Sequence, residues 1–305
     1  MTRTSLFTAP VACWADWGKV YQSIPAFTPL AEHVLRGEGL PALPLEHLTP
    51  GTNAVFRTGA YVLKIFAPTE SGMDQTLDLQ TELFAMRRAG RLGISAPKLV
   101  AEGFVEDKYR FAYMVTEYIE GIEFAQAVKT MTDGQKLAFG QKLRAVTDRM
   151  NTPCGPFNGI DAIRDKSRWT RWEAFPGRFR QERAAWLEAH DFGEFVFVHG
   201  DLCGDNILLA PQGEIYIIDF ADALSAPRSY EHALLAVEFD FDPVVLRGYF
   251  GEEAPETLAE RCFDGILIHD FGGDIVKHRI APPGEIGCLE ALRQRVYSKI
   301  KGAYA

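Results

Sequence analysis

The sequence predicts an α+β fold in which a small β-rich lobe precedes a larger, mainly helical lobe. Three observations predict it. Strand-forming segments gather between residues 45 and 116, helical periodicity dominates later, and a short hairpin pattern interrupts the helices near residue 210. The 305 residues suffice for one large domain or two lobes. A hydrophobic fraction of 47% and a charged fraction of 24% are ordinary for a globular chain.

The small lobe is expected over residues 45–116, after a Pro- and aromatic-rich extension over residues 1–44. The extension predicts one or two short helices and a connector. In the lobe itself, β-branched and aromatic residues favour strands, and leucines at helical spacing favour a helix. The elements expected there are strands at 55–56, 61–66 and 111–116 and a helix over 74–92.

The large lobe is expected over residues 117–305. Thr132 and Gln135 form a capping box that predicts the start of a helix. A polar turn at 211–213 separates two short apolar segments and predicts a hairpin. The other expected elements are a strand at 195–198 and helical stretches at 157–190, 230–239 and 289–300.

The net charge of −9 is concentrated in the last third of the chain. Residues 199–305 contain 9 basic and 18 acidic residues, and 9 − 18 = −9 accounts for the whole excess. Such a chain is a poor nucleic-acid binder, because that function needs clustered cations. The excess negative charge in the last third either forms a solvated surface or attracts cationic small molecules. Five cysteines without a C-x-x-C pair, and no long apolar run, lead us to expect a cytoplasmic, non-membrane protein.

The densest group of chemically useful side chains runs from His199 to Asn206 and continues at Asp219. A loop should leave the strand at 195–198, expose Asp201 and return at Asn206, and the hairpin should bring Asp219 back beside Asn206. Magnesium prefers oxygen ligands and takes much of its octahedral shell from phosphates and water. Asn206 and Asp219 therefore fit a Mg²⁺ site, which leaves Asp201 to face a substrate hydroxyl.

This is the arrangement of kinases, in which a loop aspartate receives the proton of the attacking hydroxyl. The run from His199 to Asn206, with the Ile-Asp pair that ends at Asp219, resembles the H-G-D-x-x-x-x-N and I-D motifs of the aminoglycoside phosphotransferase and choline kinase family. Protein kinases carry H-R-D, so Gly200 points to the small-molecule branch. The resemblance covers most of residues 45–240. It implies a bilobal protein-kinase-like fold, ATP or GTP as donor, and Mg²⁺.

The resemblance also implies nucleotide-binding residues in the small lobe. Lys64, on the expected strand at 61–66, resembles the family lysine that contacts the α- and β-phosphates. Glu82 would be its ion-pair partner, and Asp78, one helical turn earlier, is the competing candidate.

The segment that would cover the phosphates has neither a G-x-G-x-x-G loop nor a Walker P-loop. The backbone N–H groups of Gly51, Thr52 and Asn53 could cradle a phosphate, and a bare β-turn is the alternative interpretation. The resemblance further implies that Glu117 to Ile119 form the hinge, where adenine would bind through main-chain groups.

Residues 270–272 spell the Asp-Phe-Gly triplet that binds metal in protein kinases. The triplet follows no catalytic hairpin, so the equivalent position is Asp219 and we expect a coincidence. Its Asp270 stays a candidate for the acceptor groove. The resemblance gives Asp222 and Glu231 structural roles and makes His199 a brace of the loop.

We therefore expect a phosphotransferase that moves the γ-phosphoryl group of ATP or GTP to a hydroxyl of a small molecule. The acceptor stays open between an aminoglycoside-like cation and a neutral sugar, inositol or amino alcohol. A protein kinase-like enzyme and a catalytically silent nucleotide-binding module are the rivals. The oligomeric state does not follow from the sequence. Carboxylates that could pair with a cationic acceptor are Asp240, Asp242, Asp264, Asp270 and Asp274.

Overall fold

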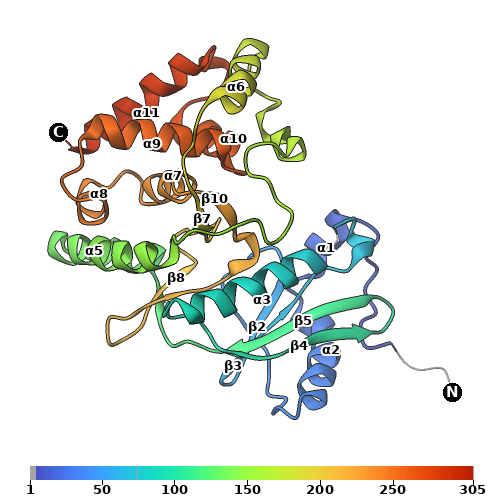
Figure 1. Ribbon diagram of the computed structural model, residues 1–305. Helices are drawn as coiled ribbons and strands as arrows, with labels where there is room; N and C mark the ends of the chain where they lie inside the picture. The colour runs from blue at the N-terminus through green and yellow to red at the C-terminus, as the bar shows by residue number, and fades with distance from the viewer. Residues whose placement is uncertain (1–4, 74, 305) are drawn as a thin grey trace. The chain divides into compact units, whose positions relative to one another are not determined.

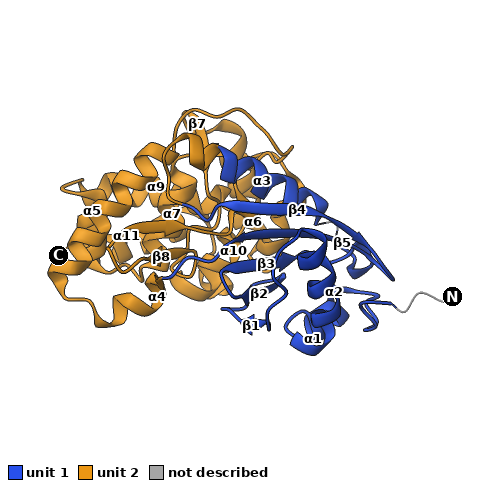
Figure 2. Cartoon of the chain, turned by 90° about the horizontal axis from the view of Figure 1, so that it is seen from below, with its two compact units in different colours: residues 1–87, 96–120 blue, residues 88–95, 121–305 orange. Residues whose placement is uncertain are grey.

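The computed structural model describes residues 5–73 and 75–304. It contains a five-stranded sheet early in the chain and mostly helices later (Figure 1), which confirms the predicted α+β class. The chain divides into two compact units, coloured separately in Figure 2. Unit 1 holds residues 1–87 and 96–120, and unit 2 holds residues 88–95 and 121–305.

Unit 1 is built on an antiparallel sheet in the order β1-β2-β3-β5-β4. Its strands are β1 (Glu46–His47), β2 (Ala54–Thr58), β3 (Tyr61–Ile65), β4 (Leu99–Glu106) and β5 (Arg110–Glu117). The sequence analysis does not predict β4. Along this edge strand the side chains are alternately half-buried and exposed as far as Phe104, so it lacks the buried apolar run that identifies β3 and β5.

Helices cover both faces of this sheet. The helical elements of unit 1 are α1 (Trp14–Val20), α2 (Ile24–Gly37), the short turn η1 (Thr69–Ser71) and α3 (Thr76–Arg91), whose last turn belongs to unit 2. α1 and α2 pack against one face, in a core that includes Phe27, Phe56 and Leu63. α3 packs against the other face, around Leu79 and Met114.

Unit 2 combines two small sheets with a helical majority. The sheets pair β7 (Phe195–Val198) with β10 (Leu224–Pro227), and β8 (Ile207–Leu209) with both β6 (Ile122–Glu123) and β9 (Ile215–Ile217). Its α-helices are α4 (Phe124–Ala127), α5 (Asp133–Met150), α6 (Gly177–Ala189), α7 (Ser229–Glu238), α8 (Pro243–Phe250), α9 (Pro255–Ile268), α10 (Gly272–Ile275) and α11 (Leu289–Tyr304). Short helical turns are η2 (Val128–Thr130), η3 (Lys166–Trp172), η4 (Phe220–Asp222), η5 (Val276–Ile280) and η6 (Pro283–Glu285).

Two local predictions can be compared directly with unit 2. The capping box at the start of α5 is confirmed, because the Thr132 side chain accepts from the Gln135 N–H and the Gln135 side chain accepts from the Thr132 N–H. The stretch at 157–190 is less helical than expected. Only η3 and α6 are regular there, since Pro156 and Gly159 and the Asp161 side-chain turn interrupt the beginning.

Close packing against α9 fixes the position of α7. A Cβ atom at Gly265 of α9 would lie 1.9 Å from the carbonyl oxygen of Ser229, the first residue of α7. Only glycine permits this approach. The first turn of α7, which carries Tyr230 and Glu231, is therefore held against α9.

None of the helices formed by the described residues combines the length and apolarity needed to cross a membrane. All five cysteines are free thiols.

Candidate functional site

The motif from His199 to Asn206 occupies the loop between β7 and β8 in unit 2. Gly200 adopts a left-handed backbone with φ of +86°, and a Cβ atom there would lie 2.0 Å from the carbonyl oxygen of Asp222. A side chain at this position would therefore both strain the backbone and collide with the loop after β9. The geometry explains why glycine follows His199.

Asp201 and Asn206 close the loop on each other. The Asn206 side-chain nitrogen donates to the carbonyl oxygen of Asp201 at 2.8 Å and to its carboxylate at 3.1 Å. With its nitrogen committed in this way, Asn206 has its amide oxygen left as the atom to offer a ligand. Both residues come to the same end of β8, as the motif spacing predicts.

The β8–β9 hairpin adds Asp219 to the group. The Ile218 N–H donates to the backbone oxygen of Asn206 at 3.0 Å, which brings the end of β9 beside the start of β8. Asp219 follows with φ of +59° and ψ of +70°, a left-handed conformation that is uncommon outside glycine. Such a backbone is retained where the surroundings impose it, and it is enriched at functional sites. The structure thus brings Asp201, Asn206 and Asp219 together.

Crowded negative charge dominates this end of the hairpin. Burial, together with the charges of Asp222, Asp219 and Glu238, raises the pKa of Asp201 to about 8. A bound cation would relieve this repulsion and favour the charged carboxylate. Among residues 5–73 and 75–304, no three His, Cys, Asp or Glu side chains form a metal cluster of their own. One carboxylate plus one amide oxygen suits Mg²⁺, which takes its remaining ligands from phosphate and water.

Two buried side chains brace the loop from behind. His199 is fully buried, and its Nε2 lies 2.9 Å from the carbonyl oxygen of Ile218. Its Nδ1 accepts from the Asp201 N–H at 3.3 Å, so Nε2 carries the hydrogen and donates. Glu231 accepts the His199 N–H at 2.9 Å and the Asn151 amide at 3.3 Å. Burial raises the pKa of Glu231 to about 7.

In unit 1, Lys64 and Glu82 form a buried ion pair, with 2.7 Å between Nζ and Oε2. The two residues are 6% and 3% exposed, so little of either charge reaches solvent. The pleat of β3 explains the geometry. Leu63 points to the α1–α2 side of the sheet, so Lys64 points to the α3 side, where Glu82 lies. A desolvated lysine held this way is prepared for an anionic ligand.

The remaining nucleotide candidates also lie in unit 1. Gly51 and Thr52 form the turn before β2, with Asn53 buried at its end. Glu117 ends β5, and its N–H donates to Lys98 while the next N–H donates to Ala60. These bonds fix the backbone that leads to Ile119. The adenine-binding role of this segment stays a prediction.

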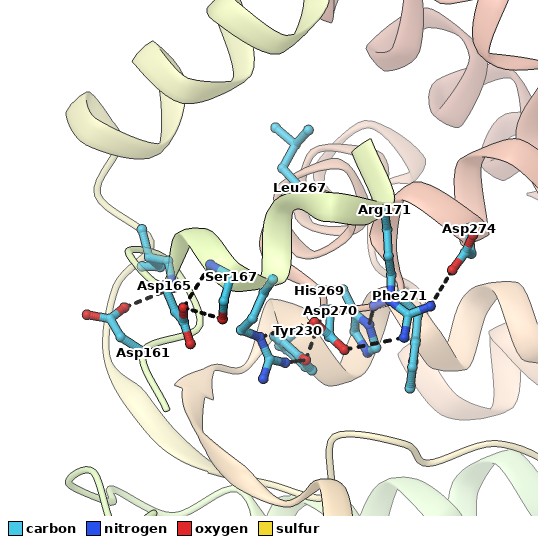
Figure 3. A network of polar contacts seen from close by, with 12 residues as sticks. Asp161, Asp165, Ser167, Arg171, Tyr230, Leu267, His269, Asp270, Phe271 and Asp274 are labelled. Carbon is cyan, nitrogen blue, oxygen red and sulfur yellow. Dashed lines mark hydrogen bonds and ion pairs between the residues drawn. The ribbon is translucent and has the colours of Figure 1, made fainter. Parts of the chain in front are cut away.

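The Asp-Phe-Gly triplet at 270–272 belongs to a network of its own (Figure 3). Asp270 lies 3.3 Å from Arg168 and 3.8 Å from Arg171, and Arg171 also pairs with Asp274 at 2.6 Å. The Tyr230 hydroxyl accepts from the Asp270 N–H and from Arg168. Asp270 is therefore held by arginines of η3.

The other carboxylates proposed to bind a cationic acceptor also lie beside basic side chains of the chain itself. Asp242 pairs with Lys136 at 2.6 Å and caps α8, and Asp264 lies 3.0 Å from His190. Asp240 is highly exposed, 3.4 Å from Arg279. Each of the five proposed carboxylates thus has a cationic group or a histidine of the chain beside it.

A pocket of about 440 Å³ lies beside the catalytic loop within unit 2. Gly204 and Asp205 line it from the loop, and Phe124, Glu238 and Phe239 line it from the helices. The Ala125 N–H donates to the Gly204 oxygen at 3.1 Å, which fixes the loop to α4.

Glu238 and Asp205 add two carboxylates to this pocket, which Asp240 and Asp242 also line. The pKa of Glu238 is raised chiefly by burial, against the charge of Arg279 and together with the charge of Asp205. Sequence reasoning missed both residues. Asp205 stands directly before Asn206 in the motif, and Glu238 lies in the last turn of the helix predicted at 230–239, so position alone could have suggested them.

The fold and the loop motif are those expected of a phosphotransferase, and comparison with known protein families agrees. The model of the phosphotransferase enzyme family, APH, matches residues 51–263. The chain belongs to this family, as the motif resemblance predicted. Comparison with curated proteins gave no match.

Solved structures share the bilobal kinase-like fold. A choline/ethanolamine kinase family protein from Mesorhizobium loti is 21% identical, with a TM-score of 0.52 over 95% of this chain and 94% of that one. Choline kinase LicA from Streptococcus pneumoniae is 18% identical, with a TM-score of 0.55 over 90% and 99%. A thermostable aminoglycoside phosphotransferase, solved with ADP and hygromycin B, is 18% identical, with a TM-score of 0.58 over 90% and 99%.

The raised pKa of Asp201 predicts a pH dependence of stability. The pKa is about 8 in the folded chain, against an ordinary value of 3.8, so the folded state binds more protons between these values. The free energy of unfolding should therefore contain a contribution that falls as pH rises from about 4 to about 8. We expect Asp201→Asn to exceed the wild type in stability at pH 8 by at least about 1 kcal/mol.

Urea unfolding at several pH values between 5 and 8 measures this difference, with Asp133→Asn, at the exposed start of α5, as control. Parallel curves for wild type and Asp201→Asn would show that the Asp201 carboxyl is not buried among like charges.

Proposed function

We propose that the protein is a nucleoside-triphosphate-dependent kinase that phosphorylates a hydroxyl group of a small molecule, with ATP as the first donor to test and GTP as the alternative. The observation that carries the proposal is the convergence of Asp201, Asn206 and Asp219 at one end of the β8–β9 hairpin. Membership of the phosphotransferase family supports it. Among the structural neighbours, LicA was solved with AMP and an aminoglycoside 2'-phosphotransferase with GDP.

In this proposal Asn206 and Asp219 hold Mg²⁺, which neutralises charge on the β- and γ-phosphates when bound. Lys64, oriented by Glu82, contacts the α- and β-phosphates. The N–H groups of Gly51 to Asn53 cover the phosphates, and the backbone of Glu117 to Ile119 receives the adenine. These assignments rest on the motif resemblance and on the contacts described above.

Asp201 acts on the acceptor. Its carboxylate orients the acceptor hydroxyl and takes its proton as the hydroxyl oxygen attacks the γ-phosphorus and the bond to the β-phosphate oxygen breaks. The nucleoside diphosphate leaves with that bonding pair. Burial and the neighbouring carboxylates raise the pKa of Asp201 in the metal-free protein, and a bound cation would favour the carboxylate form that accepts the proton. Electrostatic stabilisation supplies most of the rate.

The acceptor that the pocket beside the loop favours carries an ammonium group. Glu238 and Asp205 are carboxylates that line this pocket, where Phe124 and Phe239 are nearly fully buried. Carboxylates attract cations. Two lysines also line the pocket, against four carboxylates. Lys136 is paired with Asp242, and Lys129 lies on η2. A neutral sugar could donate hydroxyl hydrogen bonds to these carboxylates, but an ammonium group would add the attraction between opposite charges.

The two rival functions explain less. A protein kinase uses a long segment after the metal-binding aspartate to dock peptides, and here η4 and β10 occupy most of the chain between Asp219 and Glu231. A silent nucleotide-binding module would have no use for a buried Asp201 beside the metal candidates.

Removal of the base tests the central role. We expect Asp201→Ala to lower turnover by about three orders of magnitude or more, with nucleotide affinity changed less than about threefold, because Asp201 acts on the acceptor and not on the donor. Coupled measurement of ADP release and calorimetric titration of ATP provide the two numbers. Unaltered turnover would refute the assignment.

The acceptor class is tested by screening ATP and GTP consumption over aminoglycosides, amino alcohols and neutral sugars with purified protein. We expect turnover with an ammonium-bearing acceptor. Glu238→Gln should raise the KM of that acceptor about tenfold, since one charge-assisted contact is lost. Glu290→Gln, on the exposed face of α11, is the matched control. Turnover only with neutral sugars, or an unchanged KM in Glu238→Gln, would overturn the cationic assignment.

A further inference from the structure

The segment before residue 51 lies outside the family match, yet it contacts the turn assigned to the phosphates. Trp17 of α1 donates its indole N–H to the carbonyl oxygen of Thr52 at 2.8 Å. The two residues are far apart in sequence, and Trp17 is 1% exposed. Its ring packs edge-on against Phe27 with 5.7 Å between ring centres. The bond therefore joins a rigid part of the unit 1 core to the turn.

The turn sits at the same end of the sheet as Lys64. In the β2–β3 hairpin, Ala54 pairs with Ile65 and Val55 pairs with Lys64. Asn53 directly precedes Ala54 and is therefore two residues before Val55, the partner of Lys64. A bond that fixes Thr52 fixes the backbone leading into this pair.

The turn has a buried end and an open side. Asn53 is 5% exposed, and its side-chain oxygen has no hydrogen-bond partner. That oxygen is an acceptor and would repel phosphate oxygens, so the phosphate contacts are left to the N–H groups of the turn. A Cβ atom at Gly51 would meet nothing within 4 Å, so the backbone is open on that side.

Core packing alone explains the Trp17 ring but not the target of its N–H. A buried indole must find an acceptor, and many backbone carbonyls would satisfy it. Here the acceptor is the central carbonyl of Gly51-Thr52-Asn53. A fixed carbonyl sets the peptide plane between Thr52 and Asn53, and with it the direction of the Asn53 N–H.

We propose that Trp17 is a positioning residue for the nucleotide phosphates, which acts by holding the Thr52 carbonyl so that the N–H groups of the turn face the phosphates. The proposal rests on the proposed function. It makes α1 part of the donor site without requiring α1 to touch the nucleotide. Loss of the indole N–H should weaken ligands that have phosphates and leave ligands without them unaffected.

Trp17→Phe tests this, because phenylalanine retains an aromatic ring and removes the donor. Calorimetric titrations with ATP and with adenosine, both in the presence of Mg²⁺, compare ligands that differ only in the phosphates. We expect ATP to bind about fivefold more weakly, the loss typical of one hydrogen bond, and adenosine to bind within about twofold of wild type. Trp14→Phe, on the same helix and 40% exposed in the parent residue, should change neither.

The outcomes separate the two claims. Equal weakening of ATP and adenosine, no weakening of ATP, or a Trp17→Phe variant that circular dichroism shows to be unfolded would assign Trp17 a purely structural role and overturn this inference alone. A wild-type protein that binds neither ATP nor GTP would overturn the proposed function, and this inference with it.

Discussion

The candidate site in unit 2 depends on one energetically unfavourable arrangement: the Asp201 carboxyl is buried among other carboxylates. The charges of Asp222, Asp219 and Glu238 surround it, and burial removes the water that would screen them. The fold tolerates this because backbone and amide groups hold the loop from several sides, through Asn206, His199 and Glu231. Buried carboxylates that lie close together in this way are typical of sites that bind a cation.

The sequence predicts the site better than it predicts the lobe around it. The motif spacing alone places Asp201, Asn206 and Asp219 at one hairpin end, since a loop between two adjacent strands leaves few alternatives. The prediction of the Lys64–Glu82 ion pair rests on the family resemblance, with Asp78 as the alternative, because strand and helix periods alone do not identify the partner. What periodicity does not supply is the identity of partners from other elements. The bond from Trp17 to Thr52 and the charge of Glu238 beside Asp205 both depend on tertiary packing.

The fold shows the same division. Buried strands such as β3 and β5 are visible in the sequence because their apolar runs are continuous. The edge strand β4 is not visible, because most of its side chains are exposed or half-buried. The stretch before η3 looks helical in composition, yet side-chain turns at Asp161 and Asp165 hold it in irregular structure. The five acidic residues considered for the acceptor illustrate a further limit: a count of charges does not reveal which of them already have a partner.

The central claim is that Asn206 and Asp219 together bind the divalent cation of a metal–nucleotide complex. Electron paramagnetic resonance of Mn²⁺, titrated into protein saturated with ADP, tests it most directly. The account predicts a bound Mn²⁺ signal in the wild type that is lost or weakened at least about tenfold in Asp219→Ala and weakened in Asn206→Ala, with Asp274→Ala unchanged. An equally strong signal in Asp219→Ala and Asn206→Ala would contradict it.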